Sequence, residues 1–336
     1  MRIAVDAVGG DHGARVVVAG ALVGARRHDV GLVLTGPESE VRAALRAVDS
    51  AGVEVVVRDA PETIGMDEHP AQAVRRKPRS SIGVALGAVK SGEAAAMVSA
   101  GNSGAVMASA LLVIGRIPGI DRPAITAPLP SRRGRTLVLD LGAVTDPKPH
   151  HLVQFARMGA VYAREVMGIE HPTVGLLSNG EEATKGNLLV LEAHPLLAAA
   201  EGIDFRGNVE GKDLPSGVVD VVVTDGFTGN VALKVAEGVA GFVGETIRAE
   251  IVGTPLRRLA GALLRPAFRE ARAKLDYAET GGAALLGVDG MVVIAHGRSN
   301  ETAVANAVGV AVRGARVDIA RAIGAALPVE PSLSRP

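Results

Sequence analysis

Short apolar runs and longer amphipathic segments alternate along this chain. The runs rich in Val, Ile and Leu predict strands, and they lie at residues 2–5, 30–35, 53–58, 96–99, 136–139, 174–177, 218–224 and 291–295. Segments with helical periodicity lie between some of them, at residues 14–27, 38–48, 151–167 and 187–200. This alternation is typical of a mainly parallel sheet with helices on both faces. No linker divides the chain, so we expect one α/β domain over residues 1–325 and a flexible tail over 326–336.

One region, from residue 242 to about residue 277, contains no strand-like run. Its apolar residues recur at helical spacing and alternate with arginines: Leu256, Arg257, Arg258, Leu259, Leu263, Leu264, Arg265 and Phe268. Pro255 should begin one helix, and Pro266 should break or kink it. A basic amphipathic arm of this kind favours contact with a membrane surface or an acidic protein. Packing at a dimer interface explains the same pattern equally well.

Four strand-like runs end in loops rich in Gly, Asp, Asn and Ser, each followed by a helix-like run. They lie at residues 3–13, 96–108, 136–146 and 221–234. Glycine lets a backbone approach a ligand closely, and a helix N-terminus offers unpaired N–H groups to an anion. Loops after parallel strands gather at the carboxyl edge of the sheet. The four loops therefore predict a shared site for an anionic, phosphate-bearing ligand.

Composition and missing motifs narrow the chemistry. Lys and Arg number 36, as do Asp and Glu, and aromatic residues make up only 2%, so we expect no nucleic-acid partner. The chain has no Cys, which excludes a thiolate metal site and a Cys nucleophile. The dinucleotide, Walker A, zincin and serine-elbow motifs are absent. We therefore expect no cofactor and no tightly held metal. Without a secretory signal pattern or a long apolar span, we expect a cytoplasmic protein.

Candidate site residues occupy the loops after the predicted strands. In the first loop Asp11 precedes His12, which either acts as a general acid or caps the next helix. The second loop contains Gly101, Asn102, Ser103 and Gly104. Asn and Ser there serve as helix caps or as anion ligands. The third loop contributes Asp140 and Asp146.

Three later loops complete the set of candidates. Residues 178–187 include Asn179, Glu181 and Lys185, and the charged pair there forms either part of a site or a surface ion pair. Residues 225–230 include Asp225, Gly229 and Asn230, placed directly after a valine-rich run. His296 and Arg298 follow the last predicted strand, and an arginine can bind phosphate through two hydrogen bonds.

Several longer motifs occur in a characteristic order. They are VDAVGGDHG, VSAGNSGAVMA, GRIPGIDRPAI, PHHLVQFARMG, GLLSNGEEATKG, GNVEGKDL, DVVVTDGFTGNVALK and GMVVIAHGRSN. Over roughly residues 1–325 the chain resembles the bacterial acyl-acyl-carrier-protein:phosphate acyltransferases of phospholipid synthesis, the PlsX family. One departure is Val144, which stands where the family pattern D-x-G-A-N-x-D has Asn.

The resemblance implies a Rossmann-like fold similar to those of phosphotransacetylases and isocitrate- and isopropylmalate-type dehydrogenases. It also implies a homodimer, soluble or peripherally attached to a membrane. The reaction would be attack of inorganic phosphate on an acyl-carrier-protein thioester. Its product, an acyl phosphate, would supply a membrane glycerol-3-phosphate acyltransferase.

The residues suit direct attack by phosphate without an acyl-enzyme. Asn102, Ser103 and loop N–H groups would bind phosphate, with Lys185 or Arg298 as the countercharge. Asn230 would stabilise the oxyanion, and His12 or Lys185 would protonate the leaving thiolate. The carboxylates of Asp11, Asp140 and Asp225 would orient these groups. Two alternatives stay open: an isocitrate-type NAD(P)-dependent dehydrogenase, and a non-enzymatic adaptor for a carrier protein or membrane.

Overall fold

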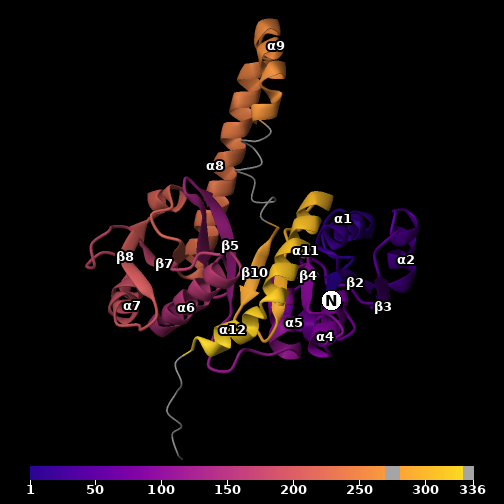
Figure 1. Cartoon of the computed structure of the whole chain (residues 1–336), viewed down its shortest axis with the longest axis horizontal. Helices are drawn as coiled ribbons and strands as arrows, with labels where there is room; N and C mark the ends of the chain where they lie inside the picture. Colours follow the sequence, from indigo (N-terminus) through magenta and orange to yellow (C-terminus); the bar gives the residue numbers. More distant parts are fainter. Residues whose placement is uncertain (269–280, 328–336) are drawn as a thin grey trace, which may run out of the picture.

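The structure is a computed structural model that describes residues 1–268 and 281–327. Its described strands form an eleven-stranded sheet in the order β3-β2-β1-β4-β11-β10-β5-β6-β9-β7-β8, with helices packed on both faces (Figure 1). Seven neighbouring strand pairs are parallel and three are antiparallel. The predicted α/β class with a mainly parallel sheet is confirmed.

The first half of the sheet carries most of the N-terminal chain. Its strands are β3 (Val55–Asp59), β2 (Gly31–Gly36), β1 (Arg2–Asp6), β4 (Ala96–Ser99) and β11 (Met291–Ile294). Its helices are α1 (Gly13–His28), α2 (Glu38–Arg46), α3 (Pro70–Arg76), α4 (Ser81–Lys90), α5 (Ser103–Val113) and α11 (Glu301–Arg316). Strands β1 and β4 are buried on both faces, which explains their uninterrupted apolar sequences.

The second half repeats the same kind of architecture. Its strands are β6 (Gly134–Leu139), β9 (Val221–Val223), β7 (Thr173–Ser178) and β8 (Asp204–Glu210). The elements around them are α6 (Pro149–Glu165), α7 (Leu188–Ala198), the 3₁₀ helix η1 (Gly211–Ser216) and α12 (Ile319–Ala325). Helix α6 packs its buried face against this half of the sheet and contributes Phe155, which is fully buried.

Two strands between the halves reverse the direction of the sheet. Strand β10 (Ala283–Leu286) is antiparallel to β11 and β5, and β5 (Ala124–Ser131) is antiparallel to β6. The strands of the second half therefore run opposite to those of the first half along the hydrogen-bonded order. Sheet twist opposes this reversal, because six steps from β1 to β9 at about 20–25° each accumulate roughly 120–150°. A twist of that size would turn the carboxyl ends of β1 and β9 partly back towards a common direction.

Each of the eight predicted strands is present, and each of the four predicted helices is present with its ends shifted by a few residues at most. Three strands were not predicted, namely β5, β8 and β10. Strand β5 contains Pro128 and Pro130 and β8 is largely polar, so neither carries an uninterrupted apolar run, whereas β10 is a short apolar run, AALL, that was overlooked.

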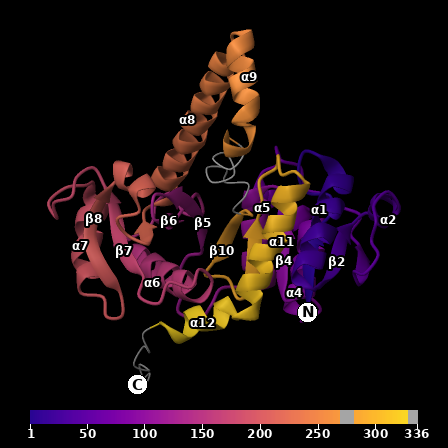
Figure 2. The same cartoon turned by 45° about the horizontal axis from the view of Figure 1, so that its top comes forward.

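A helical arm projects from the body on the side where α11 begins (Figures 1 and 2). It consists of α8 (Gly226–Val252) and α9 (Pro255–Leu263), so its first helix begins well before the predicted residue 242. Helix α9 folds back along α8, and a methyl group on Gly261 would overlap the side chain of Ile251. Pro255 begins α9 as predicted, and α9 ends at Leu263 before residues 265–268 are helical again. The rest of the predicted arm and most of the predicted tail lie outside the described residues.

Candidate active site

Asp6 is the centre of a first cluster of loops. It ends β1 with only 1% of its surface exposed and accepts a 2.6 Å hydrogen bond from the Ser99 hydroxyl. The Ser99 oxygen in turn accepts the N–H of Gly101 at 3.1 Å. Burial raises the pKa of Asp6, and the hydrogen bond from Ser99 opposes that rise. The carboxyl group thus connects the end of β1 to the loop after β4.

Close backbone contacts hold the glycine loops of this cluster together. A Cβ atom on Gly9 would lie 2.5 Å from a carboxylate oxygen of Asp6 and 2.8 Å from the backbone N of Gly101, so no larger residue fits. The N–H of Asp11 donates to the carbonyl of Gly297 at 2.7 Å. The loops after β1, β4 and β11 are therefore in direct contact.

The side chain of Asn102 is fully engaged in structural hydrogen bonds. Its oxygen accepts the N–H of Ala105 and caps α5, while its NH₂ group donates to the carbonyls of Gly65, Met66 and Glu68 at 3.2–3.3 Å. This side chain is buried, whereas Ser103, the next residue, is exposed at the start of the helix. Gly104 lies against Pro70, so it serves packing of α3 on α5.

The charged candidates of the first cluster are exposed. His12 occupies the N-cap position of α1 without making a side-chain cap hydrogen bond, so the expected capping role is not realised. Arg298 donates its backbone N–H to Nδ1 of His296 at 3.2 Å, and its guanidinium forms no ion pair with another described residue. Asp11 is exposed beside them. His12 and Arg298 are therefore accessible to an anionic ligand.

Asp140 is the centre of a second cluster. It follows β6, is completely buried, and accepts four backbone N–H groups at 2.6–3.1 Å. The donors are Ile125, Gly142, Ala143 and Val144. Burial raises the pKa of Asp140, and these four donors oppose the rise. One carboxylate thereby shapes the whole turn after β6.

Val144 takes part in this cluster through its backbone. Its N–H donates to Asp140 at 2.6 Å, and its carbonyl accepts the N–H of Gly226 at 2.8 Å. Its side chain packs on the hydrophobic core. A side-chain amide at this position is not needed for these contacts, so the departure from the family pattern leaves the loop intact.

The start of α8 completes the second cluster. Asp225 caps this helix by accepting the N–H of Thr228 at 2.8 Å. Gly229 packs directly against the backbone carbonyl of Asp140. The side chain of Asn230, half-buried, lies close to Gly142. The amide of Asn230 therefore faces the N–H-rich turn that Asp140 holds in place.

The loop after β7 is the most open of the candidate segments. Asn179, Glu181 and Lys185 are all exposed, as is Asp146 in the loop after β6. Glu181 approaches Lys212 at 3.4 Å, which is the surface ion pair expected as its alternative role, although with a different lysine. Lys185 forms no ion pair within the described part of the chain. Its side chain packs near Gly180 instead.

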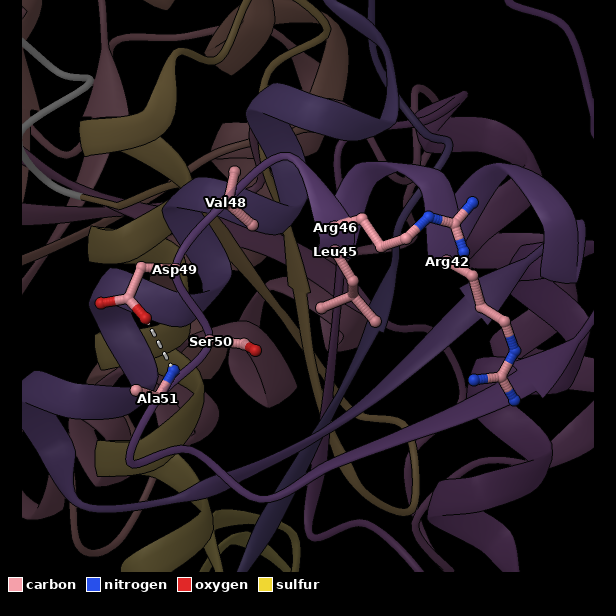
Figure 3. Close-up of a pocket in the computed structure, with 7 residues that line it drawn as sticks. All are labelled: Arg42, Leu45, Arg46, Val48, Asp49, Ser50 and Ala51. Carbon is pink, nitrogen blue, oxygen red and sulfur yellow. Dashed lines mark hydrogen bonds between the residues drawn. The ribbon is translucent and has the colours of Figure 1, made fainter.

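The two clusters lie on different halves of the sheet. The first contains the predicted residues on β1, β4 and β11, and the second those on β6, β7 and β9. Asp6 and Ser99 were not predicted as site residues, although a polar residue at the end of an apolar run was the signal that could have found them. A surface depression on α2 (Figure 3) lies at the β3 end of the sheet and contains none of the predicted residues.

Among the residues that the structure describes, two groups of side chains have spacing suitable for a metal ion, but their hydrogen bonds and ion pairs disfavour metal binding. The first group consists of Asp121, His150 and His151. In it, Nδ1 of His151 accepts the backbone N–H of Lys148. This places the ring proton on Nε2, whereas a metal-binding histidine must offer a bare nitrogen. In the second group, Glu181 and Glu210 both pair with Lys212.

Residues 1–321 match the family model described as fatty acid synthesis protein. The phosphate acyltransferase of Pelotomaculum thermopropionicum is 51% identical over 311 residues, which cover 93% of this chain and 90% of that protein. The phosphate acyltransferase of Geobacter sulfurreducens is 50% identical over 308 residues, 92% of this chain and 89% of that protein. The chain belongs to the phosphate acyltransferase family. The resemblance drawn from its motifs is confirmed.

Solved structures place the fold of this phosphate acyltransferase family member among phosphotransacetylases. The phosphotransacetylase of Streptococcus pyogenes has a TM-score of 0.64 at 18% identity, covering 96% of this chain and 94% of its own. A 4-hydroxythreonine-4-phosphate dehydrogenase from Klebsiella pneumoniae has a TM-score of 0.53 at 15% identity. The alignment covers 94% of this chain and 97% of the dehydrogenase. The predicted similarity to phosphotransacetylase folds is confirmed, and the fold is also similar to that of a dehydrogenase. A dehydrogenase activity is not favoured, because that likeness is one of fold alone.

None of the described helices has the length and apolar character needed to cross a membrane.

Proposed function

We propose that this chain transfers a fatty acyl group from acyl carrier protein to inorganic phosphate, and that the two loop clusters form its active site. The strongest support is the 51% identity with an enzyme named phosphate acyltransferase over 93% of the chain. The geometry agrees with this chemistry, because both clusters present helix N-termini and glycine-rich turns on accessible loops.

Phosphate binds at Ser103 and the N–H groups at the start of α5. The proposed countercharge is Lys185 or Arg298, each an exposed cation without an ion pair among the described residues. Asp6 holds this loop through Ser99 and Gly101. Asn102 contributes by capping the helix, since its side chain is already engaged.

In the reaction, a phosphate oxygen forms a bond to the thioester carbonyl carbon, and the carbon–sulfur bond then breaks. The products are an acyl phosphate and the carrier thiol, which takes a proton from His12 or Lys185. The negative charge on the carbonyl oxygen is stabilised by the side-chain amide of Asn230, which lies beside Gly142. Asp140 and Asp225 keep the turn after β6 and the start of α8 in place. No covalent acyl-enzyme is needed.

The arm serves peripheral attachment to a membrane, where an acyl phosphate can pass to a membrane glycerol-3-phosphate acyltransferase. Its apolar residues are highly exposed, with 77% for Leu256 and 78% for Leu263. Helix α8 also exposes a stripe that includes Val231, Val235 and Val239, and a second copy of the chain would cover it. We therefore propose a homodimer whose paired arms reach the lipid surface.

The test is thiol release from a long-chain acyl carrier protein by the purified protein. We expect release only when phosphate is present, at a rate that neither NAD nor EDTA changes. Thiol release that continues without phosphate would indicate a thioesterase. Turnover that requires NAD would restore the dehydrogenase alternative, and no turnover at all would favour the adaptor.

A further inference from the structure

The hairpin between β5 and β6 carries an unneutralised group of arginines. Arg132 and Arg133 form its turn, Arg135 follows on β6, and all three are exposed. Their guanidinium groups make no hydrogen bond or ion pair with the residues that the structure describes. Residues 122–139 contain neither Asp nor Glu, so the segment cannot neutralise itself. In a chain with a net charge of +0, this is a marked local excess of positive charge.

The acidic side chains near this turn contact groups other than the three arginines. The backbone N–H of Arg132 donates to the carbonyl of Pro215 at 2.9 Å, which places the hairpin against η1. Within that region Glu181 and Glu210 pair with Lys212. Asp213 accepts the backbone N–H of Glu210 at 2.9 Å. The arginine hairpin, defined as residues 131–135, therefore keeps its charge available for a partner.

The strand register places the arginine hairpin at the edge of the sheet where the first cluster lies. Strands β5 and β11 flank β10 and are both antiparallel to it, so they run in the same direction. Ile125 and Val292 both pair with Leu285 and therefore lie at the same level. Both strands therefore leave the sheet at one edge, two strand spacings or about 10 Å apart sideways. Strand β11 ends at Ile294, whereas β5 continues to Ser131 and carries the hairpin farther out from that edge.

We propose that the arginine hairpin is the docking site for an acidic face of the acyl carrier protein. This inference rests on the proposed function, since it concerns how the thioester reaches the site. The hairpin would attract the acidic carrier by long-range electrostatics and hold it beside the first cluster. A membrane partner fits less well, because the hairpin exposes no large apolar side chain, whereas the described part of the arm exposes several.

The test compares two thioesters of the same acyl chain, one on acyl carrier protein and one on pantetheine. In Arg132→Glu/Arg133→Glu/Arg135→Glu we expect KM for the carrier substrate to rise roughly tenfold or more. KM for acyl-pantetheine and kcat for both substrates should stay unchanged. The matched control is Arg42→Glu/Arg46→Glu on α2, which reverses charge at the far end of the sheet and should leave both KM values as they are.

A milder variant, with all three arginines changed to Gln, covers the case in which charge reversal disturbs folding. It should raise KM for the carrier substrate less than charge reversal does, and weaken the salt dependence of that KM. The inference is overturned if both thioesters lose activity equally, or if neither KM changes. It is also overturned if the hairpin variants lose binding to anionic vesicles while KM for the carrier stays normal. A wild-type protein that consumes neither thioester with phosphate would instead overturn the proposed function itself.

Discussion

Gly229 lies so close to the backbone carbonyl of Asp140 that even a methyl group would overlap that oxygen. The first turn of α8 is thus seated on the turn after β6, and both belong to the second cluster. The position of the first turn of α8 therefore depends on the shape of the turn after β6.

Replacing Gly229 with Ala should displace the start of α8. We expect a loss of roughly 1–3 kcal/mol in the free energy of unfolding, together with a large loss of turnover. The reason is that a backbone oxygen cannot move away from the added methyl group without displacing the turn that contains it. Gly238→Ala is the matched control in the same helix, where the added methyl meets nothing within 4 Å. Its helix propensity should stabilise the protein by up to about 1 kcal/mol. Denaturant unfolding measures the stability of both variants. Equal changes in the free energy of unfolding would contradict the importance of the contact between Gly229 and Asp140.

Lys185→Ala should lower turnover far more than stability. The side chain is exposed, so its loss opens no cavity, whereas loss of one well-placed electrostatic group costs on the order of 10²–10³ in rate. Lys90→Ala, an exposed lysine at the end of α4, is the control and should keep normal turnover. Steady-state kinetics of both variants tests this prediction. Nearly normal turnover of Lys185→Ala would show that Lys185 is an ordinary solvated surface residue without a catalytic role.

The raised pKa of Asp6 predicts a specific pH dependence of stability. Because burial disfavours the charged form, the folded state holds its proton to higher pH than the unfolded state does. The contribution of Asp6 to stability is therefore fully present below its ordinary pKa near 3.8 and declines as pH rises towards the raised value. Asp6→Asn should lack this decline. Urea unfolding of both proteins from pH 3.5 to 8 should show a difference in stability that shifts in favour of the variant. A pH-independent difference would contradict the prediction.

The arm prediction concerns Leu259, Leu263 and Phe268, whose side chains are 64%, 78% and 41% exposed. Changing all three to Glu should abolish binding to anionic vesicles, because it removes apolar insertion and adds repulsion from the headgroups. Activity on soluble substrates should survive. A control that changes three exposed leucines of the body, Leu112, Leu188 and Leu196, should bind vesicles normally. Vesicle sedimentation measures both, and unchanged binding by the arm variant would leave the arm to dimerisation or carrier docking.

Much of this fold could be predicted because its buried parallel strands are continuous apolar runs. Strand β5 escaped prediction because Pro128 and Pro130 normally argue against an inner strand. The structure tolerates them because β10 pairs only with residues 124–126, so the prolines lie beyond that ladder. The reversal of direction through β10 and β5 depends on long-range pairing, which local patterns do not encode.

The sequence predicted which loops carry the candidate site residues, but not the role of each residue within them. Polar residues after apolar runs marked the loops of each cluster, since the parallel strands within one half of the sheet end together. The bonding of each side chain was not predictable, as Asn102 illustrates, because its amide is taken up by the carbonyls of residues 65–68. Asp6 and Ser99 show the converse, because their importance comes from contacts between segments far apart in sequence.

The most direct test of the central claim is the fate of radiolabelled inorganic phosphate during turnover of an acyl carrier protein thioester. We predict that label and acyl group appear together in one acyl phosphate, in equal amounts with the free carrier thiol, and that hydroxylamine converts the product to a hydroxamate with release of the label. Release of free fatty acid with no label in any acyl product would contradict the account.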